Sequence, residues 1–165
     1  MKKRLTIASI MLFISGSYCA QSQNPHTKLN QSELLKQFEG NWVFEIGKDT
    51  IAYWDMKPWG TGFEAGLKYV TKGKVVKEGK GLYGYESSID KIVEAGITKG
   101  KDIGVYVMWF ITESKFVLIP YSDLANPEKA SFRMEGEFRD PDVLVETDII
   151  ENKVVKIKTW KNSKR

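Results

Sequence analysis

Residues 130–138 read ASFRMEGEF, and in this stretch apolar or small residues alternate strictly with polar ones. Successive side chains of an extended chain point to opposite faces. One face would carry Ala130, Phe132, Met134, Gly136 and Phe138, and the other Ser131, Arg133, Glu135 and Glu137. Residues 63–69 alternate in the same way. Both stretches therefore predict β-strands with one apolar face and one polar face.

Similar short runs, rich in aromatic and β-branched residues, fill most of the chain after Trp42. We predict ten strands, at about 42–46, 50–56, 62–70, 74–83, 88–97, 103–112, 115–120, 130–138, 143–150 and 153–160. Most connections have hairpin length, which favours an antiparallel meander. Closing such a sheet removes its two edges, so the predicted fold is all-β, an up-and-down β-barrel. A two-sheet sandwich is the alternative, and either face of the strands could point inward.

A short helix is predicted just before the first strand. Asn30 followed by Glu33 resembles a capping box, and Leu34 and Phe38 would share one face of the helix. Gly40 can end the helix in the left-handed conformation. The predicted domain is residues 32–160, followed by a basic tail at 161–165. The polar residues 21–31 predict a flexible connector in front of it.

The first twenty residues have the composition of a secretory signal peptide. Lys2, Lys3 and Arg4 precede an apolar run at 5–14, which is followed by the small residues 15–17. That run is shorter than the roughly 20 residues that cross a bilayer. We expect residues 1–20 to be removed and the protein to be exported, either periplasmic or secreted.

Cys19 offers a second reading of the same leader, a lipid-anchored protein in contact with a membrane. Bacterial lipoproteins are acylated on a Cys that follows small residues, whereas Tyr18 places a bulky ring beside this thiol. We therefore expect membrane contact only if Cys19 is lipidated, which the sequence disfavours. Without Cys19 the exported chain has no thiol for a nucleophile, a metal site or a disulfide.

Net charge disfavours nucleic acid as a partner. The whole chain has 25 basic and 21 acidic residues and a formal charge of +4. Loss of the leader removes three basic residues and no acidic one, so the charge falls to +1. A nearly neutral protein lacks the basic field that neutralises phosphates.

The run Phe38-Glu39-Gly40-Asn41-Trp42 resembles the Gly-x-Trp motif that opens the first strand of lipocalins and related calycins. The wider pattern comprises Gly62, Tyr69-Val70, Glu78, GLYGY at 81–85 and EGEF at 135–138. It resembles a family of exported bacterial lipocalin-like proteins of unknown function, over residues 32–160. The resemblance implies a barrel with one end closed by the short helix, a ligand cavity, and a structural role for Gly40 and Trp42. It implies no activity.

Catalytic and metal-binding chemistry has few candidate residues. The single histidine, His26, lies in the connector, so a haem ligand, a Ser-His-Asp triad and a His-based zinc site are not expected within the barrel. We expect no cofactor and no metal.

Carboxylates are the remaining route to catalysis. Glu135 and Glu146 lie on neighbouring strands whose polar faces could meet inside a barrel. The favoured interpretation is a solvated outer face, balanced by Lys156 and Lys158 on the last strand. Glu64 and Glu78 are candidates for an interior polar pair.

Aromatic residues are the stronger signal. Trp54, Tyr83, Trp109 and Phe132 are candidates to line an apolar pocket, although core packing explains such residues as well. Trp59 lies in a glycine-flanked turn, where we expect it at a portal or a partner contact.

The leading hypothesis is non-catalytic binding of a small, largely apolar molecule within the barrel. An enzyme acting on a cell-envelope lipid or sugar is an alternative, favoured if Glu135 or Glu146 faces an open cavity. A protein-interaction module is the other, favoured if the barrel is filled and its outer apolar residues form a patch.

Overall fold

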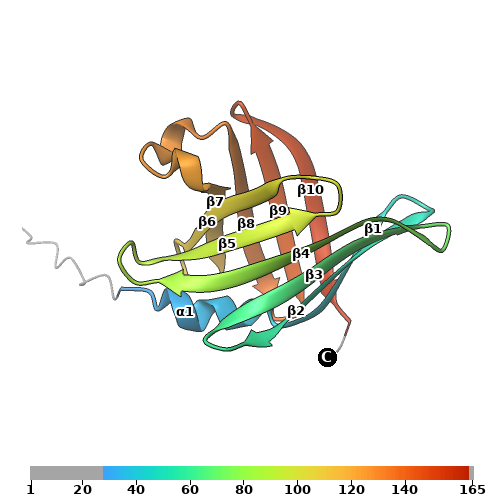
Figure 1. Cartoon of the computed structure of the whole chain (residues 1–165), viewed down its shortest axis with the longest axis horizontal. Coiled ribbons are helices and arrows are strands. Elements are labelled where there is room, and N and C mark those ends of the chain that lie inside the picture. Colours follow the sequence, from blue (N-terminus) through green and yellow to red (C-terminus); the bar gives the residue numbers. More distant parts are fainter. Residues whose placement is uncertain (1–27, 164–165) are drawn as a thin grey trace, which may run out of the picture.

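The computed structural model describes residues 28–163, which form a closed β-barrel of ten antiparallel strands (Figure 1). The strands are β1 Gly40–Ile46, β2 Thr50–Trp59, β3 Gly62–Thr71, β4 Lys74–Glu86, β5 Lys91–Thr98, β6 Ile103–Phe110, β7 Lys115–Pro120, β8 Phe132–Asp140, β9 Val143–Ile150 and β10 Lys153–Asn162. Each strand pairs with the next along the chain, and β10 pairs with β1 through Trp42↔Asn162 and Val43↔Lys161. The predicted up-and-down barrel of ten strands is confirmed.

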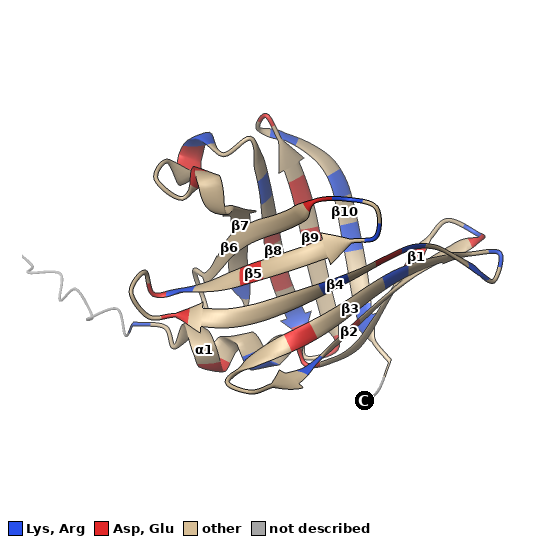
Figure 2. Ribbon diagram, viewed as in Figure 1, with Lys and Arg blue, Asp and Glu red and all other residues tan. Residues whose placement is uncertain are grey.

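The apolar face of the alternating stretch at 130–138 points inward. Phe132, Met134 and Phe138 of the alternating stretch all belong to or pack against the core cluster, together with Trp42, which is fully buried. Acidic and basic residues are intermingled along the strands and turns (Figure 2). Within residues 28–163, no helix is both long enough and apolar enough to cross a bilayer.

The short helix closes one end of the barrel. It consists of α1 Gln31–Leu34 and the 3-10 helix η1 Leu35–Phe38. The Asn30 side chain accepts a hydrogen bond from the backbone N–H of Glu33, so the predicted cap is confirmed. Trp42 donates its indole N–H to the carbonyl of Phe38 at 2.7 Å, which ties the first strand to the helix. We call the opposite end, with the turns at 47–49, 72–73, 99–102 and 151–152, the mouth of the barrel.

Two expected boundaries differ from the structure. Gln31 is buried and begins the helix, so the ordered fold starts before residue 32. β10 continues to Asn162 because the closure of the barrel requires that residue opposite Trp42. The expected signal peptide, with Cys19, and His26 lie outside the described residues.

Gln31 holds the helix to the barrel wall. Its Nε2 donates to the carbonyl of Phe110 at 3.1 Å, and its Oε1 accepts from the Phe110 N–H at 2.7 Å. We expect Gln31→Ala to lower the free energy of unfolding by about 1–3 kcal/mol, because it leaves buried backbone groups unpaired. Urea denaturation measures this. Gln37→Ala, which removes an exposed bond to Glu113, is the control and should cost less. Equal losses in the two variants would contradict the role given to Gln31.

Candidate functional site

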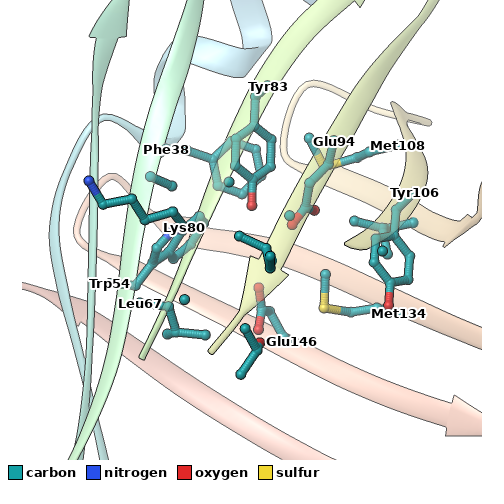
Figure 3. A pocket seen from close by; sticks show the side chains of 18 of the residues that line it. Phe38, Trp54, Leu67, Lys80, Tyr83, Glu94, Tyr106, Met108, Met134 and Glu146 are labelled. Carbon is teal, nitrogen blue, oxygen red and sulfur yellow. The ribbon is translucent and has the colours of Figure 1, made fainter. Parts of the chain in front are cut away.

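A cavity of about 450 Å³ occupies the inside of the barrel (Figure 3). Phe38 lines it at the closed end, and Lys101 and Asp102 line it at the mouth. Most of the wall between them is apolar or aromatic. It includes Trp54, Leu67, Met108, Leu118, Met134 and Trp160. A space of this size, lined in this way, suits a small organic molecule.

A row of very small residues across four strands leaves room for the cavity. Ala65, Gly81, Gly96 and Gly104 are register partners in turn across β3, β4, β5 and β6. All four line the cavity. At Gly96 an added Cβ would meet only ordinary contacts, 3.5 Å from Glu94 Oε1 and 3.6 Å from the Lys80 carbonyl. We call these four residues the small-residue row.

Glu94 faces the cavity beside this row. Its register partners are Tyr83 on β4 and Tyr106 on β6, so a tyrosine flanks it on each side. Figure 3 shows the Glu94 carboxyl and the Tyr83 hydroxyl pointing into the same space. Burial raises the pKa of Glu94 to about 7; a hydrogen bond with Tyr83 lowers it, the charge of Glu146 raises it and Lys158 lowers it. Glu94 therefore titrates near neutral pH.

Glu146, Asp148 and Lys158 form an internal ion-paired network. Lys158 Nζ lies 2.9 Å from a Glu146 oxygen and 3.0 Å from an Asp148 oxygen. The Trp160 indole N–H donates to Glu146 at 2.8 Å. Burial acts to lower the pKa of Lys158, but the two carboxylates outweigh it and raise that pKa. The partners of Glu146 come from the protein itself, whereas Glu94 has no cation within salt-bridge distance among the described residues.

The expectation of an outer face shared by Glu135, Glu146 and Lys158 is wrong for the last two residues. Glu146 and Lys158 point inward, and only Glu135 lies outside, 3.0 Å from Arg133. The register explains the separation. Glu135 pairs with Thr147, while Glu146 pairs with Gly136, so the two glutamates lie on opposite faces.

Glu64 and Glu78 do not form an interior pair. Glu64 is 2.7 Å from Lys57 and Glu78 is 3.2 Å from Lys99, and both ion pairs are partly or largely exposed. Alternation places them outside, because their neighbours Phe63, Ala65 and Gly79 occupy the inner positions.

The aromatic candidates divide into two groups. Trp54 and Tyr83 line the cavity, and Phe132 packs edge-on against Tyr106, which also lines it, at 6.4 Å between ring centroids. Trp109 lies outside, with the Lys91 ammonium 4.4 Å from its ring centroid. Trp59, the last residue of β2, is 60% exposed beside the turn to β3 at the closed end, so it is not at the mouth.

Sequence reasoning missed Glu94, Tyr106 and the small-residue row as parts of one site. Glu94 alternates with Ile92 and Gly96, but Val93, Ala95 and Ile97 make an equally apolar opposite face. The available signal was the recurrence of glycine at 79, 81, 96 and 104 within predicted strands, which marks a wall without side chains.

No group of three or more His, Cys, Asp or Glu side chains in residues 28–163 could hold a metal ion. Comparison of the chain with protein-family models, curated proteins and solved structures found no match. The geometry of the cavity is therefore the basis for any assignment of function.

Proposed function

We propose that this protein binds a small, largely apolar molecule inside its barrel, without covalent chemistry. The observation that carries the proposal is the cavity of about 450 Å³ with its largely apolar and aromatic wall. Burying ligand surface against such a wall contributes about 25 cal/mol per Å². The polar groups of Glu94 and Tyr83 would fix the orientation of the ligand.

Two measurements on the purified protein test the proposal. Native mass spectrometry would reveal a retained small molecule, and titration with Nile red, a neutral apolar dye, would give a saturable rise in dye fluorescence. The absence of both a retained small molecule and saturable dye binding would contradict the proposal.

Filling part of the cavity should weaken dye binding. We expect Gly96→Leu to weaken Nile red binding roughly tenfold or more, because the new side chain extends from the small-residue row into the space that the dye would occupy. Gly84→Leu is the matched control, since Gly84 lies on the opposite face of β4 from Tyr83 and an added Cβ meets nothing within 4 Å. Equal binding by the two variants would contradict a site inside the barrel.

Catalysis through a carboxylate is a second candidate function, and one observation favours it. Glu94 has a pKa of about 7 in a cavity, which suits a general acid or base at neutral pH. Glu146 also faces inward, but its Oε2 is already paired with the Lys158 ammonium and accepts a hydrogen bond from the Trp160 indole N–H. Any molecule that mass spectrometry identifies should be incubated with the wild type and with Glu94→Gln. Conversion by the wild type alone would support the enzyme, and unchanged recovery from both would support the carrier.

An interaction module is less well supported, because that hypothesis depends on a filled barrel. We also propose export and membership of the lipocalin-like family. The leader composition and the Gly40–Trp42 motif at a helix-closed barrel end support these two proposals. Fractionation of cells that express the full chain tests export, because the processed protein should leave the cytoplasm.

A further inference from the structure

The charges inside the cavity are unbalanced around Glu94. Glu94, Glu146 and Asp148 face inward with Lys158, and the salt bridges of Lys158 go to the other two carboxylates. Around Glu94 itself lie Tyr83 on β4, Tyr106 on β6, and the charges of Glu146 on β9 and Lys158 on β10. Lys101 and Asp102 add one charge of each sign at the mouth. The described chain thus supplies Glu94 with a hydroxyl donor but no cation in contact.

The surroundings of Glu94 suit a cation better than an anion. An anionic ligand group would approach Glu94 and Glu146 together in a desolvated space, which is costly. A cation there gains a charge-assisted hydrogen bond. The aromatic rings of Tyr83 and Tyr106, which flank Glu94 and line the cavity, add cation–π attraction to such a group. Figure 3 shows that the Lys80 side chain leads away from the space between Tyr83 and Glu94.

We propose that the ligand is a small amphiphile with a protonated amine, which sits against Glu94 and Tyr83 while its apolar part lies among Trp54, Leu67 and Met108. This inference rests on the proposed carrier function and specifies its ligand class. The small-residue row provides the room, because the Glu94 oxygen lies 3.5 Å and 3.8 Å from the Cβ positions that Gly96 and Gly81 leave empty.

Three probes of equal chain length test the inference by displacing Nile red: octylamine, octanol and octanoate. At pH 8 we expect octylamine to bind about tenfold or more tightly than octanol, and octanoate to bind weakest. The advantage of octylamine over octanol should shrink towards pH 5, where Glu94 accepts a proton. Glu94→Gln should lose the advantage at all pH values. Glu64→Gln, which changes a glutamate on the outer surface, should keep it.

Tyr83→Phe provides a second variant with a distinct readout. The hydrogen bond with Tyr83 lowers the pKa of Glu94, so its removal should raise that pKa. The pH at which octylamine loses half of its advantage should therefore move upward. An unmoved midpoint would mean that another group titrates, and would overturn the inference.

The remaining outcomes separate the two proposals. If Nile red binds and the three probes displace it equally, if octanoate binds tightest, or if Glu94→Gln keeps the octylamine advantage, the amine inference is overturned and the carrier proposal stands. If Nile red does not bind and no probe is retained in native mass spectrometry, both are overturned.

Discussion

Replacing Lys158 with Met should lower the free energy of unfolding by about 3–5 kcal/mol at pH 7, because removing one partner leaves buried charge uncompensated. The Lys158 side chain is only 13% exposed, and it is the cation that both Glu146 and Asp148 contact. Chemical denaturation followed by Trp fluorescence measures the loss. If Lys158→Met folds with unchanged stability, the buried network of Glu146, Asp148 and Lys158 does not stabilise the protein as we expect.

The stabilising effect of Lys158 should depend on pH in a direction set by its pKa. The pKa of Lys158 is raised in the folded protein, so its stabilising effect is present below pH 10.5 and is lost as the pH rises through that raised pKa. The difference in unfolding free energy between Lys158→Met and the wild type should therefore narrow as the pH rises through that raised pKa.

A control of matched geometry lies on the outer surface. Lys158 and Glu146 are register partners across β9 and β10, and Lys57 and Glu64 are register partners across β2 and β3. The two ion pairs have similar lengths, 2.9 Å and 2.7 Å, but the Lys57 side chain is 65% exposed. Lys57→Met should leave stability nearly unchanged, because solvent screens an exposed pair. A larger stability loss in Lys158→Met than in Lys57→Met would therefore be assigned to the burial of the Lys158 ion pairs.

The fold could be predicted from local pattern because the alternation at 130–138 and 63–69 and the hairpin-length turns agree with one another. A closed barrel is the arrangement that satisfies all of these features without an exposed edge. The Asn30 cap was equally local, since donor and acceptor lie within one turn of the helix. These features can be predicted without knowing which residues from distant parts of the sequence come into contact.

The facing of β9 could not be predicted in that way, because both of its faces are apolar in part. Leu144 and Glu146 alternate with Val145 and Ile149, and the structure buries residues from both sets. The pairing of β9 with β8 and β10 decides which of its faces points into the barrel. Lys158 inside the barrel makes Glu146 acceptable there, which is a contact between residues that local patterns treat as separate.

The candidate site was predicted only in part for a similar reason. Trp54 and Tyr83 could be predicted as cavity-lining residues because aromatic side chains are common in the walls of ligand pockets. The pKa of Glu94 depends in part on Tyr83, Glu146 and Lys158, which lie on three other strands. Desolvation by the closed barrel raises its pKa, and the sequence around residue 94 carries no sign of that environment.

Glu94→Gln should stabilise the protein at pH 8 by about 3 kcal/mol, because each unit of pKa shift corresponds to 1.36 kcal/mol. The pKa of Glu94 is about 7 when folded, against an ordinary value of 4.5. Between these values the folded state holds a proton that the unfolded state has released, so wild-type stability falls as the pH rises from about 4.5 to about 7. Gln carries no charge at any pH and avoids this loss. Its amide oxygen can still accept a hydrogen bond from Tyr83.

Denaturant unfolding of both proteins at pH 4.5, 6 and 8 measures the effect, and the gain from Glu94→Gln should grow across that series. Glu64→Gln should change stability little at any of the three pH values. The hydrogen bond with Lys57 lowers the pKa of Glu64, but solvent screens this exposed pair. A gain from Glu94→Gln that is the same at all three pH values would show that packing, and not the desolvated charge, separates the variant from the wild type. This destabilisation agrees with the proposed cationic ligand, because the same desolvation that costs the folded protein stability would strengthen the bond between Glu94 and an amine.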